Sequence, residues 1–145
     1  MYLDTINISE LERFFNDLKL VDQRKIFAAG FRKAANPLKN KMQALVPVKT
    51  GNLRRSIGSS IARDEIALYV GTKIGGANDG WYGHFLEEGT KDRYRKDGSE
   101  TGKIKGKHFA SLAFMYTEDE VYSNIEQEWY KAIDRFIVRT NKKLK

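Results

Sequence analysis

The apolar positions of the chain follow two different periods, and the clearer one is helical. Between Asp22 and Val46 the apolar residues recur at steps of three and four, as on one face of an amphipathic helix. Asp22 is predicted to cap this helix, and Pro37, which removes a backbone donor, is predicted to kink it near Asn36. The phase continues past Pro37, which favours a kink over a break. The repeated positions are Phe27, Phe31, Ala34, Leu38, Met42 and Leu45.

Two further helices are predicted near the ends of the chain. Ser9, followed by Glu10 and Glu12, is typical of a helix start, and Leu11, Phe14, Phe15 and Leu18 would form its apolar face. Thr117 is predicted to cap the last helix because three acidic residues follow it. The inner face of that helix would carry Val121, Ile125, Trp129, Ala132, Phe136 and Thr140, with Ile133 and Ile137 beside them.

Residues 47–90 have a shorter period that predicts strands. Leu53, Ile57 and Ile61 form one side of a first strand, "ARDE" a turn, and Ile66, Leu68 and Val70 a second strand, giving a hairpin over residues 53–73. A glycine-rich loop follows, and "WYGHFLEEGT" is predicted to be a third strand that ends at Gly89. The sequence therefore predicts an α+β fold in which N-terminal helices and a C-terminal helix pack on a small, mainly antiparallel sheet of three to four strands.

The length of 145 residues is that of one ordinary domain. It is divided here into a helical segment (residues 1–46), a strand-rich segment (47–90), a basic loop (91–107) and a C-terminal helix (108–145). Cysteine is absent, so a disulfide framework and a thiolate metal site are both excluded. The start of the chain has no signal-peptide pattern, and no stretch has the length of a membrane span. We therefore expect assembly in a cytoplasm, without insertion into a membrane.

The residues offer little catalytic chemistry. His84 and His108 are the two histidines, and without cysteine a zinc site would need carboxylates to complete it. Glu87 and Glu88 are adjacent, so on a strand they would face opposite sides and could not act as a carboxylate pair. "GSETGKI" lacks the spacing and the Ser or Thr of a phosphate-binding loop. We predict no enzyme activity, no catalytic or metal-binding residues and no cofactor.

A net charge of +7 favours contact with a polyanion or an acidic protein surface. The polar loop over residues 91–107 has seven Lys or Arg residues against three acidic residues, and Tyr94 could stack on a base. A solvated loop and a contact with DNA or a protein partner both remain open. The candidate contact residues are Lys91, Arg93, Arg95, Lys96, Lys103, Lys105 and Lys107.

Three elements in order resemble the gene-product-ten-like family of tailed-phage neck and tail-completion proteins. They are "VPVKTGNLRRSI", then "WYGHFLEEGT", and then "KHF" before a terminal amphipathic helix. The resemblance spans residues 27–138, although the third element lacks the proline usual in the family and the loop 91–107 is longer than usual. The matching positions are Pro47, Thr50, Gly51, Leu53, Arg54, Ser56, Tyr82, Glu87, Gly89, Thr90 and Phe109, with His108 beside Phe109.

The resemblance implies a non-enzymatic structural virion protein at the neck, the head–tail junction or the upper end of the tail. It implies a homo-oligomeric ring around the DNA channel, with sixfold symmetry, that completes the tail for head joining. The partners would be other copies of the chain and neighbouring head-completion, tail-terminator or tail-tube proteins, with non-specific contact to channel DNA. The alternative function is that of a small basic DNA-binding protein.

The first element can be interpreted without an anion. Pro47 is predicted to end the helix, Thr50 and Gly51 to turn the chain, and Leu53 to begin a strand. Arg54 and Arg55 would then point to opposite faces and could not form one phosphate clamp. One of them is expected to meet Glu87 or a neighbouring subunit, so charge reversal at either is predicted to impair assembly more than folding.

Overall fold

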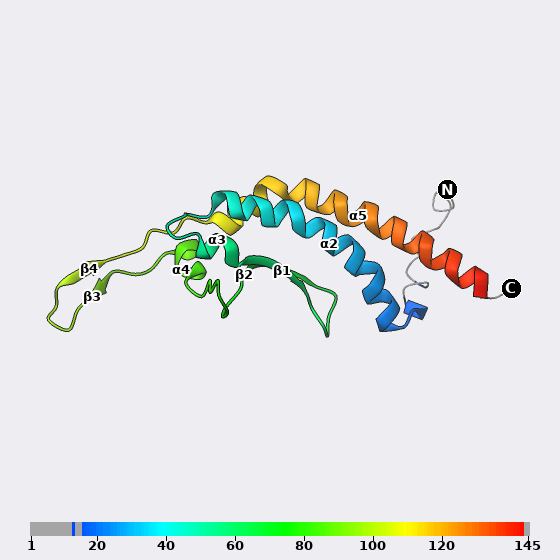
Figure 1. Ribbon diagram of the computed structural model, residues 1–145, viewed down its shortest axis with the longest axis horizontal. Helices are drawn as coiled ribbons and strands as arrows, with labels where there is room; N and C mark the ends of the chain where they lie inside the picture. Colours follow the sequence, from blue (N-terminus) through cyan, green and yellow to red (C-terminus); the bar gives the residue numbers. More distant parts are fainter. Residues whose placement is uncertain (1–12, 14–15, 144–145) are drawn as a thin grey trace. The chain divides into compact units, whose positions relative to one another are not determined.

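The structure is a computed structural model that describes Arg13 and residues 16–143 (Figure 1). Of the predicted first helix, Leu11, Phe14 and Phe15 lie outside these residues, Arg13, Asn16 and Asp17 are helical, and Leu18 packs beside Ile26. The chain divides into two compact units. Unit 1 comprises Met1–Ala35, Ile61–Leu68 and Asp119–Lys145, and unit 2 comprises Asn36–Ser60 and Tyr69–Glu118. None of the helices among the described residues is long and apolar enough to cross a membrane.

Helix α2 spans Leu20–Leu45 and contains Pro37 without a break, as the phase of its apolar positions predicts. Pro37 lies two residues beyond Ala35, the last residue of α2 in unit 1. The predicted cap is wrong, because Asp22 lies inside the first turn, where a carboxylate still interacts favourably with the helix dipole. The helix ends where predicted, and the N–H of Val46 donates to the carbonyl of Met42 at 2.9 Å just before Pro47.

Helix α5 spans Phe109–Lys143, so it starts eight residues before the predicted cap at Thr117. Thr117 is buried inside the helix, and its hydroxyl donates to the carbonyl of Ala113 at 2.8 Å. The inner face is confirmed where side chains are described: Val121, Ala132 and Ile133 are buried. Thr140 lies at a position whose side chain is not described.

Strands β1 (Ile57–Ile61) and β2 (Leu68–Thr72) form a hairpin, as predicted for these residues. The N–H of Ala62 donates to the carbonyl of Ala67 at 3.0 Å and closes the turn. Ile66 was predicted to lie within the second strand, but it lies in the bend and is 38% exposed. The predicted turn "ARDE" is therefore longer than four residues.

Two segments predicted to be strands are helices. Helix α3 spans Asn52–Ser56 and contains both Arg54 and Arg55, so the prediction that they lie on opposite strand faces is wrong. Helix α4 spans Gly83–Glu88, where a third strand was predicted. The prediction that Glu87 and Glu88 lie on opposite faces of a strand is therefore also wrong. In α3 the buried residues Leu53 and Ser56 are three residues apart, a spacing that lies on one face of a helix but on opposite faces of a strand.

The basic loop 91–107 also has regular structure. Strands β3 (Arg93–Tyr94) and β4 (Glu100–Gly102) pair antiparallel in a second hairpin, with Arg93 opposite Gly102 and Tyr94 opposite Glu100. The α+β class is therefore confirmed, but the four strands lie in two separate two-stranded sheets and not in one sheet. We refer to residues 91–107 as the arm, and Figure 1 shows it leading away from α4 and from the start of α5.

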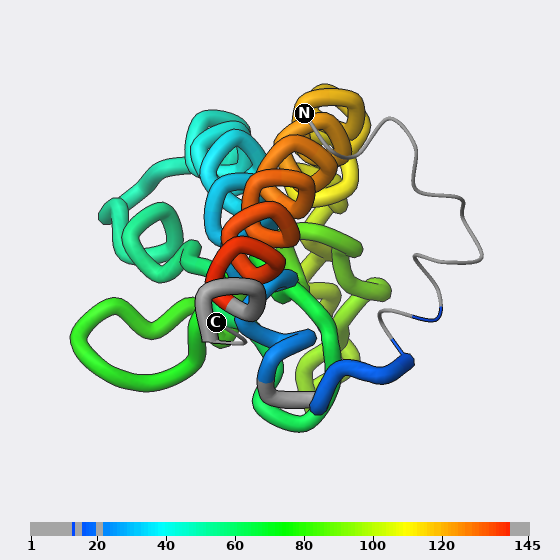
Figure 2. The backbone as a smooth tube through the Cα atoms, turned by 90° about the vertical axis from the view of Figure 1, so that its right-hand side faces the viewer, coloured from blue at the N-terminus to red at the C-terminus, as the bar shows by residue number. Residues whose placement is uncertain are grey.

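Each unit has its own apolar core, and in both α2 lies beside α5 (Figure 2). In unit 2 the core contains Met42, Val46, Leu53, Ile57, Phe109 and Ala113. In unit 1 it contains Ile26, Ala132 and Ile133, and Phe27 packs edge to face on Trp129 with ring centroids 4.7 Å apart. The amphipathic faces of both long helices are thus used along most of their described length.

Candidate interaction site

All the motif residues and all the candidate cations lie in unit 2. The first motif forms an elbow between α2 and β1. Gly51 has φ +80°, a conformation that favours glycine, and it directly precedes α3. Leu53 then enters the core, and the hydroxyl of the buried Ser56 donates to the carbonyl of Leu53 at 2.7 Å. Pro47 and Thr50 are exposed, and the N–H of Asn52 donates to the Thr50 hydroxyl at 3.4 Å.

Arg55 is engaged within the elbow itself. Its guanidinium donates to the side-chain oxygens of Asn52 at 2.7 Å and Asn78 at 3.0 Å, and to the carbonyl of Thr50 at 3.3 Å. Arg54 is exposed on the same short helix. Among the described residues, no ion pair joins either arginine to Glu87. The structure therefore assigns Arg55 to holding the loop 73–80 against the elbow.

Two glycines at the start of the second motif, Gly80 just before it and Gly83 within it, pack against the elbow and against β2. A methyl group added at Gly80 would collide with the Ser56 hydroxyl, and one added at Gly83 would lie 2.8 Å from Cγ2 of Thr72. Both glycines therefore permit close contact that a larger residue would prevent. Between them, Tyr82 packs against the core of unit 2.

Glu87 holds the start of α5. Its carboxylate accepts from the N–H of Ala110 at 2.8 Å, and from the N–H and hydroxyl of Ser111 at 3.0 and 2.6 Å. These are N–H groups of the first helical turn, which have no partner within the helix and which favour a negative charge. The sequence offered Arg54 or Arg55 as a partner of Glu87, whereas the recorded partners of its carboxylate are Ala110 and Ser111 of α5.

The environment of Glu87 acts on its pKa in two directions. Burial raises the pKa, but the hydrogen bonds from Ser111 and Ala110, and the charge of His108, outweigh burial and leave it below its usual value. His108, the residue before α5, has φ +50°, which is rare for a residue other than glycine. Its backbone N–H donates to the carbonyl of Glu87 at 3.1 Å, so both the main chain and the side chain of Glu87 bind this junction.

Gly89 and Thr90 close the base of the arm. Gly89 has φ +87° and forms a bridge to Lys105, and an added methyl group there would lie 2.7 Å from the carbonyl oxygen of Ile104. The N–H of Thr90 donates to the carbonyl of Ile104 at 2.9 Å, and the N–H of Ile104 donates to the Thr90 hydroxyl at 2.9 Å. Gly106 is equally close-packed, with an added methyl group 2.8 Å from the carbonyl oxygen of Glu88.

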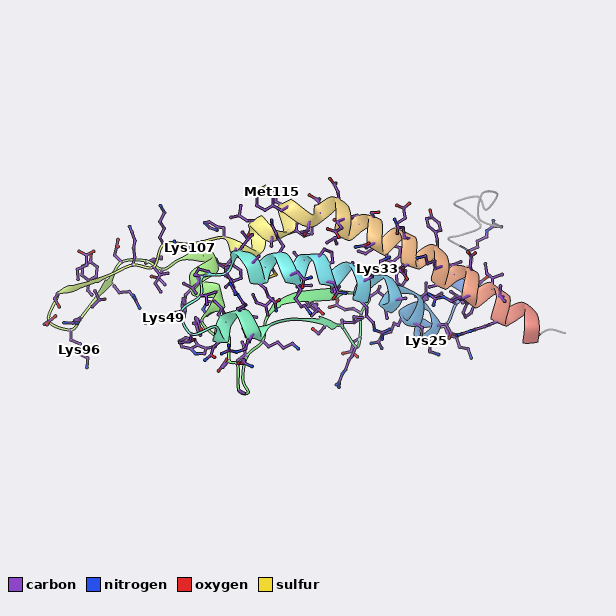
Figure 3. All side chains as sticks on the ribbon, turned by 45° about the horizontal axis from the view of Figure 1, so that its top comes forward. Lys25, Lys33, Lys49, Lys96, Lys107 and Met115 are labelled. Carbon is purple, nitrogen blue, oxygen red and sulfur yellow. The ribbon has the colours of Figure 1, made fainter. Side chains whose placement is uncertain are left out.

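The arm presents its charges to solvent. Its seven cations are all exposed, and Figure 3 places Lys96 near the tip and Lys107 at the base. The ion pair recorded within the arm is that of Lys103 with Asp92 at 3.6 Å, between side chains that are 62% and 45% exposed. An exposed pair of this kind contributes little to stability. The cations are Lys91, Arg93, Arg95, Lys96, Lys103, Lys105 and Lys107.

Sequence reasoning missed the hairpin because the arm has no apolar alternation. The usable signal was Asp97-Gly98, a dipeptide typical of tight turns. Gly98 has φ +83°, and the Asp97 carboxylate accepts from the N–H and the hydroxyl of Ser99 at 2.9 and 2.6 Å. These bonds also hold the pKa of Asp97 below its usual value.

Exposed aromatic residues next to α4 are a second feature that the sequence did not single out. Trp81 is 54% exposed and packs edge to face on Phe85, with ring centroids 6.0 Å apart. The ring of His84 lies 3.9 Å from that of Phe85, and its Nδ1 is 2.8 Å from the carbonyl oxygen of Trp81. Within the described part of the chain, no group of three or more His, Asp or Glu residues is placed to hold a metal ion.

Comparison with known proteins gives one family. The profile of the family described as "Bacteriophage HK97-gp10, putative tail-component" matches residues 9–89, more than half of the chain. No curated protein and no solved structure gives a significant match. The matched segment includes the elbow and α4 and stops at Gly89, so the arm and α5 lie beyond it. The chain belongs to the HK97-gp10-like family of bacteriophage tail components.

Proposed function

We propose that this chain is a structural virion protein at the neck or the upper end of the tail of a tailed bacteriophage. Copies of it form a ring, with six subunits expected from the family resemblance, and the ring completes the tail for joining to the head. The observation that carries the proposal is the family match over residues 9–89. Assembly takes place in the cytoplasm of the host bacterium, and neighbouring head-completion, tail-terminator or tail-tube proteins are the partners.

The arrangement of unit 2 supports this proposal. The motif residues Leu53, Ser56, Glu87 and Gly89 are used for internal packing and internal hydrogen bonds. Because these contacts are internal, they would hold the elbow and the base of the arm in the same conformation in every subunit of the proposed ring. Arg54, Thr50 and Pro47 are exposed on the elbow, where we propose that they contact a neighbouring subunit.

The proposal is tested in the phage that encodes this chain. The gene is deleted, and particles are purified and examined by negative-stain electron microscopy, with and without the chain supplied from a plasmid. We expect separated heads and tails, or tails with an unfinished upper end, and recovery of joined particles on complementation. Normal, infectious tailed particles from the deletion phage would overturn the proposal.

The alternative function, a small DNA-binding protein, is favoured by the seven exposed cations of the arm. Contacts between these cations and phosphates would give an affinity that falls steeply with salt and does not depend on sequence. Fluorescence anisotropy of labelled double-stranded DNA at 50 and 200 mM NaCl measures this. Absence of binding at 50 mM NaCl would eliminate the alternative, and strong binding together with a viable deletion phage would favour it over the structural role.

A further inference from the structure

Charge is distributed unevenly between the arm and α5. The arm has seven cations and three acidic residues, a net charge of +4, whereas residues 108–130 have five acidic residues and no Lys or Arg. The chain as a whole has a charge of +7, so the sign of this stretch is opposite to that of the whole chain. Two oppositely charged surfaces on one chain can attract each other between copies and orient the encounter.

The acidic stretch includes an exposed face of α5. Asp119, Tyr122, Ser123 and Glu126 follow one another at steps of three, one and three, so they lie on the same side of the helix. All four are exposed, Tyr122 with 57% of its surface. Asp119 and Glu126 are about 10 Å apart along the helix axis, from the rise per residue of an α-helix. We call these four residues the acidic face.

The arm has a matching periodicity. Along its second half, the exposed Lys103, Lys105 and Lys107 alternate with partly buried residues at 102, 104 and 106. In extended backbone, alternate residues point to the same side and lie about 6 to 7 Å apart. Lys103 and Lys105, which lie between β4 and the Gly89–Lys105 bridge, are thus about 6 to 7 Å apart, and their long side chains can reach two carboxylates about 10 Å apart. Tyr94, 65% exposed, supplies an apolar surface on the same arm.

The ion pair recorded within the arm engages one of its seven cations. Among the described residues, the recorded ion pairs of the arm do not include any acidic residue of α5, and Lys103 pairs with Asp92 of the arm itself. Within unit 2 the arm leads away from the start of α5 (Figure 1). In Figure 3, Lys96 and Lys107 mark the two ends of this extended segment.

We propose that the arm of one copy docks along the acidic face of α5 in a second copy of the chain. Lys103 and Lys105 pair with Asp119 and Glu126, and Tyr94 packs beside Tyr122. The two surfaces are different, so the contact is heterologous: each copy donates one arm and accepts another. A heterologous contact propagates head to tail and produces a ring when its rotation closes. This inference rests on the proposed ring and specifies the contact that builds it.

Charge reversal on each side, and then on both, tests the contact. The arm variant is Lys103→Glu/Lys105→Glu, the helix variant is Asp119→Lys/Glu126→Lys, and the third variant combines all four changes. The control is Arg32→Glu/Arg63→Glu, which changes the net charge as much as the arm variant does at two other exposed positions. Circular dichroism verifies that each full-length protein folds.

Self-association is measured by sedimentation velocity over a range of concentrations at 50 and 300 mM NaCl. We expect each reversal to weaken association at least about tenfold, because like charges then face each other. The combined variant should regain most of the wild-type association, and the control should match wild type. Added salt should weaken wild-type association, since exposed charges are screened within about 8 Å at physiological ionic strength.

The inference is overturned if the wild-type chain remains monomeric, if the arm variant associates like wild type, or if the combined variant shows no recovery. It is also overturned if the arm variant loses only its affinity for labelled double-stranded DNA, because DNA is then what the arm binds. Complementation of the deletion phage separates this inference from the proposed function. If the arm variant restores infectious particles as well as wild type does, the arm contact is wrong while the structural role remains.

Discussion

The junction between α4 and α5 and the arm that leaves it use their polar groups in opposite ways. At the junction, the Glu87 carboxylate accepts three hydrogen bonds, and the carbonyls of Leu86 and Glu87 accept the N–H groups of Lys107 and His108. In the arm, every side chain from residue 91 to residue 101 is exposed. The difference teaches that Glu87, within the residues matched by the family, holds the start of α5, whereas the exposed cations of the arm lie outside the matched residues.

The largest difference in the free energy of unfolding is expected when an aromatic residue of each region is replaced by alanine. Phe109 is 3% exposed in the core of unit 2, whereas Tyr94 is 65% exposed on the arm. Phe109→Ala should lower the free energy of unfolding by about 3–5 kcal/mol, because it leaves a cavity. Tyr94→Ala should change it by less than about 0.5 kcal/mol. Urea denaturation followed by circular dichroism measures both, and equal effects would contradict the distinction.

Two glycines with similar φ angles give the next largest contrast in stability. Gly89 has φ +87° and Gly98 has φ +83°, but an added methyl group meets the Ile104 carbonyl at Gly89 and open space at Gly98. Gly89 also has ψ −174°, which with its positive φ is a conformation essentially limited to glycine, so Gly89→Ala should cost about 2–4 kcal/mol from the conformation and the overlap together. Gly98→Ala should cost only about 1–2 kcal/mol, from the conformation alone. Thermal denaturation of the two variants compares them directly, and a smaller loss at Gly89 would show that the base of the arm adapts.

Glu87 gives a prediction that depends on pH. Glu87→Gln should lower the free energy of unfolding by about 1–2 kcal/mol at pH 7, since the helix start loses a charged acceptor. A carboxylate with a lowered pKa stabilises the fold above its unfolded pKa, near 4.3, and this contribution is lost as pH falls through the folded pKa. The difference between wild type and Glu87→Gln should therefore shrink below about pH 4.3.

Urea midpoints at pH 7, 5 and 3.5 measure the Glu87 effect. Glu88→Gln is the matched control, because Glu88 is the exposed neighbour on the same helix. We expect its stability to differ from wild type by less than about 0.5 kcal/mol at each pH. A difference between wild type and Glu87→Gln that stays constant from pH 7 to 3.5 would show that the carboxylate charge is not what holds α5.

The smallest effects concern the paired arginines of the elbow. Arg55→Glu should cost about 1 kcal/mol, because the guanidinium donates to Asn52, Asn78 and Thr50. Arg54→Glu, at an exposed position with no such bonds recorded, should leave stability within about 0.5 kcal/mol. Arg54→Glu is predicted instead to impair assembly of the proposed ring. Unfolding and sedimentation of both variants test this, and a larger loss of stability for Arg54→Glu would refute it.

The long helices could be predicted from the sequence because their signal is local and repeated. Phe31, Ala34 and Met42 recur with a helical period, and all three are buried on α2. The start of α5 could not be predicted in the same way, because its cap is Glu87, more than 20 residues away in sequence. Thr117 had the expected local pattern, but the contact with Glu87 allowed the helix to begin earlier.

The short elements of unit 2 were misassigned for a related reason. Leu53 was placed on the strand that begins at Ile57, although the spacing of four residues from Leu53 to Ile57 also fits a helical turn, and α3 is too short to establish a period. The contact role of the motif residues stays a prediction. The motif residues do lie together in unit 2, but their close contacts depend on glycines such as Gly80 and Gly83, whose neighbours cannot be inferred from one sequence.

The closed base of the arm makes this segment separable from the rest of unit 2. Because the Thr90–Ile104 hydrogen bonds and the Gly89–Lys105 bridge hold its two ends together, the chain between them can change length at small cost. Each doubling of such a loop costs only about 0.6 kcal/mol in closure entropy. A phage lineage can therefore lengthen, shorten or recharge the arm while the helices that support it keep their sequence.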